Sequence, residues 1–489
     1  MKHTNLKFKR NLGKTIISIS GAKWTTISTL TTAVIQVLRL SILARFLDKS
    51  DFGIVAILTF VLGLTNTFAD LGFSAAIMHK QELSRNEFAS LYWIQMFFFL
   101  LLFCIGCSLS TVCANFYNED SITYLLPVVL LDLVFNGIGR LYDTVLQKDM
   151  LFKTIAVRNI VSAVLSIIIA MLLALMGYGI YSMILSTLFN TLTFNIWNFI
   201  CGQKYFKLKF RISIKDIKPL VQIGLFQTGT QILDYFAAKF DILIIGKLLG
   251  TENLGIYNLS KELVMKVILL INTISNKVAL PIFANIQKDR EVLRLAYCKI
   301  ITLLSRINFP ISACICVLSS QIVGVLYGEG YEKVAELTAI LSFWSLFLCL
   351  GNPVGALAVA TGKTNLSLYY TILRCLVTLP CVYIASCLDI TAVAWSNCLL
   401  GAVMFLFSWK IQISQMIGLR LKDYLSSFRK EITIAFFIAV PLYVFFSGDY
   451  IPSLNGVYTQ LLLYGAIFFC LYVLVLYLSY GSIKNYLKI

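Results

Sequence analysis

Histidine is almost absent from this chain, which has only His3 and His79 among 489 residues. Two isolated histidines near the ends of segments exclude a histidine-based zinc site and a Ser-His-Asp triad. Charged residues are also scarce, since they make up 13% of the chain, against about 25% in ordinary soluble domains. Long hydrophilic stretches are missing too, so no soluble domain of any size fits between the apolar segments.

Hydrophobic residues make up 58% of the chain. A bilayer core of about 30 Å takes about 20 apolar residues per helix, and such segments follow one another here with short polar breaks. The sequence therefore predicts an all-α polytopic membrane protein. We expect fourteen transmembrane helices, at about residues 20–46, 52–78, 87–114, 121–146, 153–176, 179–202, 217–248, 254–284, 292–326, 332–360, 365–387, 390–416, 430–447 and 457–480.

Thirteen cysteines lie almost wholly within these apolar segments. The spacing of Cys104 and Cys107 is that of a redox or metal pair, but both fall in mid-helix without further ligands nearby. We therefore interpret the cysteines as packing residues and expect neither a metal nor a cofactor. The N-terminus shows no cleavable signal peptide, because no small-residue cleavage site follows a short apolar core.

Lysine and arginine are distributed unevenly between alternate loops, which explains the net charge of +17 without a nucleic-acid partner. One set of loops carries nearly all of them, and the opposite set carries only Arg45, Lys49, Lys247 and Lys333. Basic loops stay in the cytoplasm. We therefore expect both termini in the cytoplasm and a multi-pass protein in the bacterial cytoplasmic (inner) membrane.

A twelve-residue phrase occurs twice, as Leu43–Ile54 and again 202 positions later as Ile245–Ile256. Both copies fall between two apolar segments on the predicted outer side, with six helices between them. Repeats that share one orientation are typical of transporters with two parallel lobes. We expect a first lobe at 1–210 with helices one to six, a second at 211–418 with helices seven to twelve, and two C-terminal helices at 419–489.

The predicted lobes are joined by a basic loop that contains Lys204, Lys207, Lys209 and Arg211. Clustered cations at this place mark the cytoplasmic side of the membrane. The same cluster is also able to bind anionic lipids, to which each Lys or Arg contributes about 1 kcal/mol. Both interpretations remain open from the sequence.

Polar residues recur every three to four positions on the first two helices of each predicted lobe. Such stripes cost free energy in a membrane unless they face water or one another. They favour one polar cavity enclosed by equivalent helices of both lobes. The residues are Thr25, Ser28, Thr32, Gln36 and Arg39, then Asn66 and Asp70, then Gln227, Gln231, Asp234, Lys239 and Asp241, and finally Asn258, Lys261, Glu262, Lys266, Asn272 and Asn276.

Structural ion pairs are the alternative explanation for these charges, for example Arg39 with Asp70 or Lys239 with Asp241. Charges on other helices also have local explanations. Arg140 and Asp143 are three residues apart and can satisfy each other. Arg158 lies near a predicted cytoplasmic end, where we expect its side chain to reach the interface.

Three stretches carry a family resemblance: Ile42–Ile54, Phe68–Ile77 and Phe240–Asn258. They resemble the Wzx-like polysaccharide (lipid-linked oligosaccharide) flippases of the MOP superfamily. The resemblance implies a MATE-like fold of two six-helix lobes related by pseudo-two-fold symmetry, which open alternately to each side. It also implies a cationic cavity for an undecaprenyl-diphosphate-linked oligosaccharide that is carried to the outer leaflet for O-antigen, capsule or exopolysaccharide synthesis.

The resemblance also suggests roles for individual residues. Contacts to the diphosphate are expected from Arg39, Lys239, Lys261 and Lys266. The carboxylates of Asp70, Asp241 and Glu262 are expected to order these cations or to bind a coupling ion. The implied partners are the lipid-linked oligosaccharide, membrane lipids, a glycan polymerase and glycosyltransferases.

Three further functions stay open on the sequence. A peptidoglycan lipid II flippase is closely similar, and a MATE-like cation-coupled drug antiporter needs an excess of carboxylates in the cavity. A membrane-embedded glycan polymerase or ligase usually has a large outer loop with catalytic Arg or His, and no outer loop here exceeds about a dozen residues. A transporter is therefore favoured over an enzyme.

Overall fold

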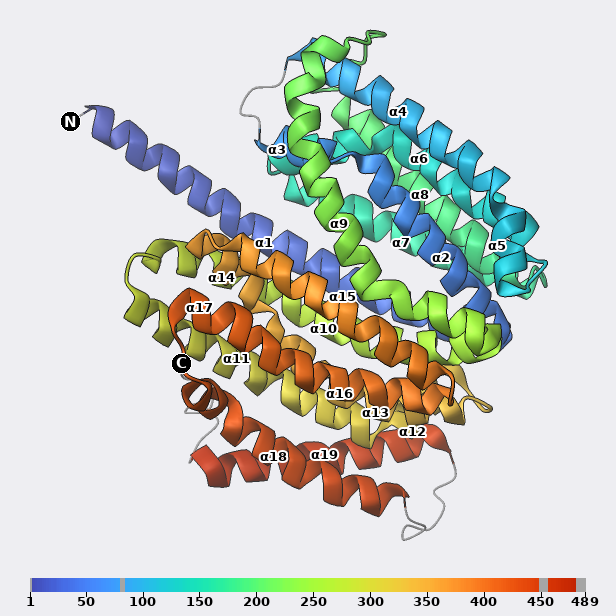
Figure 1. The fold of residues 1–489 in the computed structure, drawn as a ribbon, viewed down its shortest axis with the longest axis vertical. Coiled ribbons are helices and arrows are strands. Elements are labelled where there is room, and N and C mark those ends of the chain that lie inside the picture. Colours follow the sequence, from blue (N-terminus) through green and yellow to red (C-terminus); the bar gives the residue numbers. More distant parts are fainter. Residues whose placement is uncertain (1, 80–83, 448–455, 481–489) are drawn as a thin grey trace. The chain divides into compact units, whose positions relative to one another are not determined.

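The computed structural model describes residues 2–79, 84–447 and 456–480, and Figure 1 shows their helices. The chain divides into two compact units, Met1–Lys247 and Leu248–Ile489. The first unit holds α1 (Lys2–Leu43), α2 (Lys49–Asp70), α3 (Phe73–His79), α4 (Arg85–Ser108), α5 (Ser110–Tyr117), α6 (Ile122–Lys148), α7 (Phe152–Leu175), α8 (Ile180–Gly202) and all but the last residue of α9 (Ile214–Leu248).

The second unit continues with helices of more varied length. They are α10 (Gly250–Ile286), α11 (Arg290–Val317), α12 (Ser319–Tyr327), α13 (Glu332–Gly351), α14 (Pro353–Thr361), α15 (Thr364–Ser386), α16 (Ile390–Ser408), the π-helical turn η1 (Trp409–Ile413), α17 (Ser414–Ile417), α18 (Leu421–Ser447) and α19 (Val457–Tyr480).

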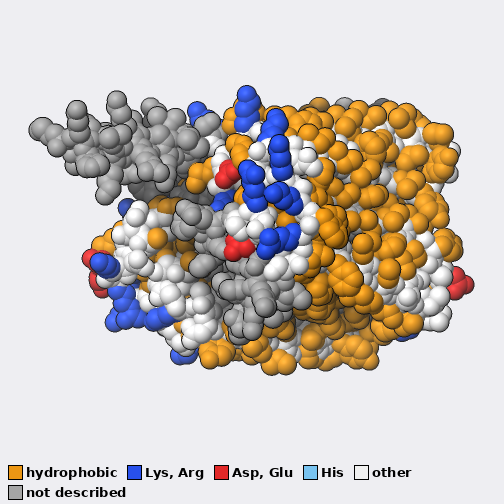
Figure 2. Space-filling view, turned by 90° about the horizontal axis from the view of Figure 1, so that it is seen from above, with side chains coloured by type: hydrophobic (Ala, Val, Ile, Leu, Met, Phe, Trp, Pro, Cys, Tyr) orange, Lys and Arg blue, Asp and Glu red, His pale blue; other side chains and the backbone are white. Residues whose placement is uncertain are grey.

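The predicted all-helical class is confirmed, because each predicted segment coincides with one helix or with helices separated by a short break. Within the described residues, ten helical segments are long and apolar enough to cross a membrane. The described helix α8 is not among the ten, and it carries Asn190, Asn195 and Asn198. Hydrophobic side chains nevertheless cover a broad part of the surface in Figure 2. The count of fourteen membrane crossings stays a prediction.

The repeated phrase forms the same kind of junction twice. Its first copy links α1 to α2, and its second copy links α9 to α10. Equivalent apolar residues are buried alike, with Phe52 and Leu254 exposed by 1% and 0%, and Ile54 and Ile256 by 7% and 6%. The repeat therefore reflects a shared local packing. The symmetry of whole lobes and their boundaries at 210 and 418 stay predictions.

In the first unit, α6 is the central helix, since it packs against α2, α3, α4, α5, α7 and α8, while α1 packs on α7. The contact of α6 with α8 is especially close at Gly139. A Cβ atom added there would lie 2.5 Å from the backbone oxygen of Asn195. Small residues allow such close contacts between membrane helices, where packing rather than the hydrophobic effect drives association.

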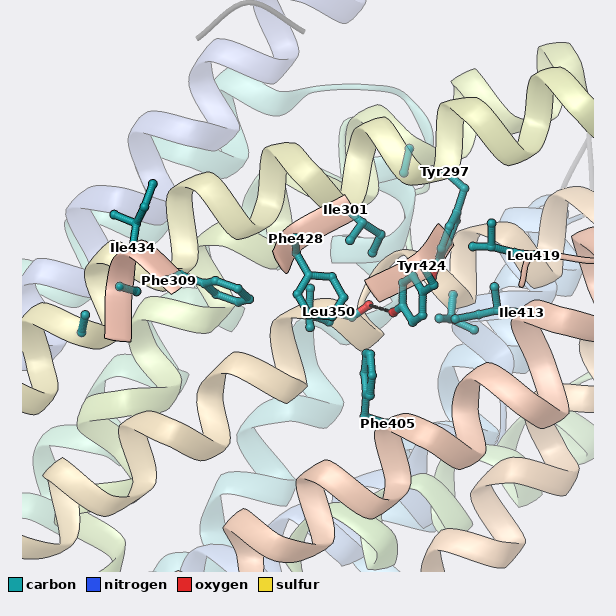
Figure 3. Packing of buried hydrophobic residues seen from close by; sticks show 14 of the residues in the cluster. Tyr297, Ile301, Phe309, Leu350, Phe405, Ile413, Leu419, Tyr424, Phe428 and Ile434 are labelled. Atoms are coloured by element: carbon teal, nitrogen blue, oxygen red, sulfur yellow. Dashed lines mark hydrogen bonds between the residues drawn. The ribbon is translucent and has the colours of Figure 1, made fainter. Parts of the chain in front are cut away.

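The second unit has an aromatic core beneath α18. The ring of Tyr424 stacks on Phe405 with centroids 5.2 Å apart and lies 6.1 Å from the ring of Tyr297. Its hydroxyl donates to the carbonyl of Leu350 at 3.4 Å, as Figure 3 shows. These contacts attach α18 to α11, α13 and α16. The two C-terminal helices are therefore packed parts of the second unit.

We predict that Gly139→Ala lowers the stability of the protein by about 1–3 kcal/mol, because the new methyl group meets backbone that cannot easily move. Gly355→Ala is the matched control, since nothing lies within 4 Å of its added Cβ. Alanine in that exposed helical position is expected to be neutral or stabilising by up to about 1 kcal/mol. Thermal unfolding in detergent measures both changes. Equal effects of the two substitutions would contradict the close α6–α8 contact.

Candidate functional site: polar pockets of the first unit

A stripe of polar side chains runs along α6. Asp132, Asn136, Arg140, Asp143 and Gln147 are spaced by four, four, three and four residues, which places them on one face of the helix. Groups of this kind inside a membrane helix require partners or water. The sequence contains this stripe, but sequence reasoning treated its charges separately and missed it as a unit.

The first part of the stripe binds amides from neighbouring helices. Asp132 is 5% exposed and accepts hydrogen bonds from Asn136 at 2.6 Å and from Asn66 of α2 at 3.4 Å. The carbonyl oxygen of the Asn136 side chain accepts from Asn195 of α8 at 3.0 Å. This chain of amides connects α2, α6 and α8 through hydrogen bonds between side chains.

The middle of the stripe forms an ion pair with α2. Arg140 Nε donates to Asp70 Oδ1 at 2.9 Å, and the hydroxyl of Ser74 donates to the same oxygen at 2.7 Å. The Asp70 side chain is almost fully buried, whereas 37% of the Arg140 side chain is exposed. The expected local pairing of Arg140 with Asp143 is therefore wrong, because Arg140 bonds to α2 instead.

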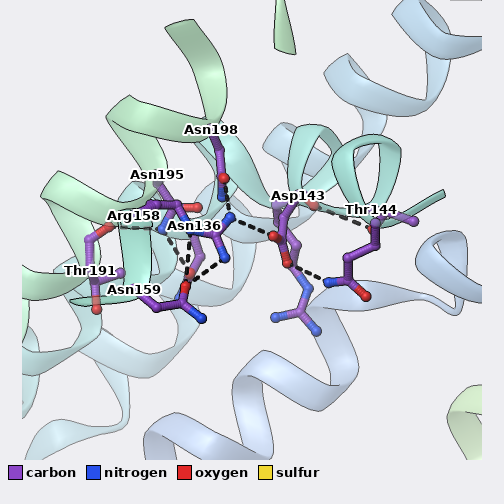
Figure 4. A network of polar contacts seen from close by, with 10 residues as sticks. Asn136, Asp143, Thr144, Arg158, Asn159, Thr191, Asn195 and Asn198 are labelled. Atoms are coloured by element: carbon purple, nitrogen blue, oxygen red, sulfur yellow. Dashed lines mark hydrogen bonds and ion pairs between the residues drawn. The ribbon is translucent and has the colours of Figure 1, made fainter. Parts of the chain in front are cut away.

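The last part of the stripe binds α7. Arg158 Nη1 donates to Asp143 Oδ1 at 2.5 Å and also bonds to Asn198 of α8 (Figure 4). The guanidinium lies 3.7 Å from the centroid of the Phe194 ring. Arg158 is 2% exposed, so the predicted interfacial position of its side chain is wrong. Burial with a carboxylate and an amide partner holds it inside the unit.

Two adjoining pockets lie along this network. The first has a volume of about 400 Å³ and is lined by residues of α3, α6 and α8, including Ser74, Asn136, Arg140, Thr144 and Asn195. The second has a volume of about 490 Å³ and is lined by residues of α1, α6, α7 and α8. Asp143, Gln147 and Phe194 line both. Together the pockets present amide, carboxylate, guanidinium and hydroxyl groups beside two aromatic rings, those of Phe152 and Phe194.

The polar stripe predicted on α1 lines the second pocket through Thr25, Ser28, Thr32 and Gln36. The pocket is formed within the first unit, between α1 and helices α6, α7 and α8. A cavity shared by both predicted lobes stays a prediction. Arg39, further along α1, donates to Ser166 Oγ of α7 at 3.1 Å and to Thr187 Oγ1 of α8 at 2.8 Å.

The other predicted site residues lie on α9 and α10. On α9, Lys239 is half-buried and Asp241 is buried, and the Asp241 carboxylate accepts from the backbone N–H of Ile242 at 3.0 Å. On α10, Lys261 is 7% exposed, and its ammonium lies 5.5 Å and 5.7 Å from the ring centroids of Tyr257 and Trp344.

Glu262 and Lys266 form an ion pair at 3.2 Å one turn apart on α10. The structure thus brings these two predicted site residues together and connects Asp70 to Arg140, outside the predicted set. In the part of the chain that the structure describes, no three His, Cys, Asp or Glu residues are grouped to hold a metal ion. The roles of all seven predicted residues in binding stay predictions.

The chain is similar to proteins of polysaccharide biosynthesis. The family described as "Polysaccharide biosynthesis protein" matches residues 42–336. The teichuronic acid biosynthesis protein TuaB of Bacillus subtilis is 28% identical over 425 residues, covering 85% of this chain and 86% of TuaB. The lipopolysaccharide biosynthesis protein WzxC of Escherichia coli is 24% identical over 433 residues, covering 87% of this chain and 86% of WzxC.

Among solved structures, the lipid II flippase MurJ in an inward closed conformation has a similar fold. The alignment covers 93% of this chain and 98% of the MurJ chain, with a TM-score of 0.75 and 14% sequence identity. At that identity the likeness concerns the fold alone. This likeness confirms the all-helical part of the predicted fold class. With the ten apolar helices and the bacterial relatives, it supports a multi-pass bacterial membrane protein.

We predict that the buried Asp143–Arg158 pair has a larger coupling energy than the half-buried Glu262–Lys266 pair. The Arg158 side chain is 3% exposed, against 26% for Lys266. We expect about 1–3 kcal/mol for the first pair and about 0.3–0.5 kcal/mol for the second. Two double-mutant cycles with alanine, followed by unfolding in detergent, measure these values. Similar coupling in both cycles would show that the Arg158 network is weakly stabilising.

Proposed function

The chain belongs to the polysaccharide biosynthesis protein family, and we propose that it is a flippase for a lipid-linked oligosaccharide. The substrate is an undecaprenyl-diphosphate-linked oligosaccharide, which the protein moves from the cytoplasmic to the outer leaflet by alternating access. The product serves the synthesis of a surface polysaccharide. The family match over residues 42–336 carries this proposal, and the relatives named for teichuronic acid and lipopolysaccharide biosynthesis support it.

The proposed architecture has fourteen transmembrane helices in two pseudo-symmetric lobes, 1–210 and 211–418, followed by two C-terminal helices at 419–489. Both termini lie in the cytoplasm, and the protein resides in the inner membrane. Helices at all fourteen predicted segments and the similar junctions at the two copies of the repeat support this plan. The structure groups most of α9 with the first compact unit, whereas the proposed plan assigns that helix to the second lobe.

The two pockets of the first unit are the proposed site for the sugar part of the substrate. Sugars present hydroxyl groups that both donate and accept hydrogen bonds, and planar amide, carboxylate and guanidinium groups match them in pairs. Asn136, Asn159, Asn190 and Gln147 supply such groups, and Phe194 adds an aromatic ring. Volumes of about 400 and 490 Å³ lie in the range of small-molecule sites.

The diphosphate requires cations. Arg140 joins the predicted set of Arg39, Lys239, Lys261 and Lys266, because it lines a pocket and 37% of its side chain is exposed. Its bond to Asp70 fixes the direction of the guanidinium and leaves the planar group able to make further bidentate contacts with phosphate oxygens. Asp70 therefore serves as an orienting residue in this proposal, and Asp241 and Glu262 keep their predicted roles.

The membrane potential favours export of such a substrate. Moving one charge across 100 mV is worth about 2.3 kcal/mol, so a dianion leaving a negative interior gains roughly 4–5 kcal/mol if the charges of the protein stay fixed. This gain supports outward transport without a catalytic step. A transporter is also the better description than an enzyme, because no predicted outer loop exceeds about a dozen residues, whereas polymerases and ligases of this class usually carry a large catalytic outer loop.

A peptidoglycan lipid II flippase is the main competing function. MurJ shares the fold, but 14% identity does not extend that similarity to the substrate. A MATE-like drug antiporter and a membrane-embedded polymerase or ligase are also compatible with an apolar, multi-helix sequence. The names of the relatives at 28% and 24% identity favour surface polysaccharide over lipid II and over drugs as the substrate, and the short predicted outer loops disfavour a polymerase or ligase.

We predict that deletion of the gene abolishes the surface polysaccharide and traps its lipid-linked precursors in the cytoplasmic leaflet. The measurement is extraction of lipid-linked oligosaccharides combined with an assay of their orientation across the membrane. A protein required for peptidoglycan would instead arrest growth and accumulate lipid II. Unchanged glycan together with altered drug tolerance would contradict the flippase proposal and favour the antiporter.

We predict that the double variant Arg140→Gln, Asp70→Asn reduces glycan export at least tenfold while protein abundance is retained. Neutral amides preserve a hydrogen bond between α6 and α2 but remove the cation of the first pocket. Arg306→Gln, Glu431→Gln is the matched control, since it neutralises a buried ion pair of the second unit at 3.2 Å. Equal loss of export in both would indicate that any buried pair is required, contrary to a binding role for Arg140.

A further inference from the structure

The segment between α8 and α9 is held firmly against the ends of α4 and α6. The Tyr142 hydroxyl of α6 donates to the carbonyl of Phe206 at 3.0 Å, and Trp93 Nε1 of α4 donates to the carbonyl of Lys209, also at 3.0 Å. The N–H of Ser213 donates to Ser90 Oγ at 3.1 Å. Three such bonds within eight residues fix the course of the backbone.

From Phe206 to Lys209, side chains alternate between the protein and the surface, and the next three side chains are all exposed. Phe206 stacks on Phe88 with ring centroids 4.7 Å apart, and Leu208 packs against the same hydrophobic cluster. The intervening Lys207, Lys209 and the following Arg211 are exposed. The segment therefore presents a row of cations, which we call the basic edge, on a fixed backbone.

The basic edge lies close to the start of a long hydrophobic surface. Trp93 contacts the segment, and Phe97, one turn further along α4, is 62% exposed and begins a series of exposed apolar residues that includes Leu100 and Leu101. Four helical residues span about 6 Å. The headgroup region on each side of a bilayer is about 5–8 Å thick. The basic edge is therefore at the depth of lipid headgroups.

Apolar side chains accompany the cations on the same segment. Phe210 is 81% exposed and Ile212 is 55% exposed, and the ring of Phe210 lies 5.1 Å from that of Trp93. Figure 2 shows Lys and Arg side chains gathered beside the broad hydrophobic surface. Cations next to exposed aromatic and aliphatic groups are typical of membrane interfaces. A protein or nucleic-acid partner would account for the cations, but it would not account for exposed apolar side chains at the depth of the lipid headgroups.

We propose that the basic edge is a binding site for anionic phospholipid headgroups, such as phosphatidylglycerol. Lys207, Lys209 and Arg211 bind the phosphates, while Phe210 and Ile212 contact the upper acyl chains. The nearby carboxylate of Glu87 accepts from the backbone N–H of Ser84 at 3.0 Å and belongs to the N-terminal cap of α4. The site is separate from the polar pockets and does not depend on the proposed transport of a glycan.

The test compares lipid binding to the purified full-length protein in detergent by native mass spectrometry. The probes are phosphatidylglycerol and phosphatidylcholine with identical acyl chains. We expect the wild type to bind phosphatidylglycerol at least tenfold more tightly than phosphatidylcholine. The variant Lys207→Gln, Lys209→Gln, Arg211→Gln is expected to lose most of this preference, because the backbone contacts of the segment do not involve the altered side chains.

The matched control is Lys410→Gln, Arg420→Gln, Lys422→Gln, which removes three cations from the same predicted side of the membrane. The control is expected to keep the preference. Equal losses in both variants would overturn a specific site and indicate general attraction by net charge. If the first variant does not fold, the wild type provides the test, since a preference that is unchanged between about 0.05 and 0.5 M salt would overturn the ionic basis of the proposal.

Discussion

Polar side chains inside apolar helices have to find partners within the protein, because the hydrocarbon around them offers none. In the first unit, many of these polar side chains lie on α6. Asp132, Arg140 and Asp143 each bond to a residue of α2 or α7, and Asn136 bonds to α8. The positions of three neighbouring helices around α6 are thus set by hydrogen bonds whose loss would leave a buried charge or amide unsatisfied. The missing side chain of Gly139 then allows the backbone of α8 to approach α6 at Asn195.

Some of the groups that fix the helices also line the pockets. Asp143 and Arg158 line the space where α1, α6, α7 and α8 meet, and Asn136 and Arg140 line the first pocket. In the proposed function, these groups bind the substrate. The stability of the first unit and its proposed binding function therefore depend on one set of residues. A single substitution in the stripe therefore changes the stability and the proposed binding together, because it leaves a buried charge without its partner. Replacing both members of an ion pair by neutral amides is needed to separate the two effects.

Much of the fold was predictable from the sequence, because a membrane helix needs about 20 apolar residues and the charges of the loops alternate. The stripe on α1 was also predictable, since spacing of three to four residues defines a helical face. Spacing does not reveal which helix that face meets. Arg140 binds Asp70, 70 positions away in the chain, although Asp143 lies only three positions away. Arg158 was assigned to the interface from its place near a helix end, but Asp143 and Asn198 hold it inside. These partners depend on tertiary packing, which periodicity does not encode.

The offset of 202 that relates the repeated phrases also relates positions of α6 to positions of α13, and the two helices carry different polar groups there. Asn136, Arg140 and Asp143 correspond to Thr338, Ser342 and Ser345, all of them buried. The stripe is thus polar in both units, but the second has short hydroxyls.

A short hydroxyl in a helix bonds to the carbonyl three or four residues earlier and needs no neighbouring helix. Thr338, Ser342 and Ser345 do this, donating to the carbonyls of Val334, Ala339 and Ser342 at 2.7, 2.6 and 2.6 Å. The hydroxyls of Ser345 and Ser312 of α11 also form a hydrogen bond at 2.6 Å. The amide, guanidinium and carboxylate at the corresponding positions of α6 bond instead to side chains of α8, α2 and α7. At corresponding positions, long polar groups of α6 therefore join neighbouring helices, whereas the short hydroxyls of α13 also bond within their own helix.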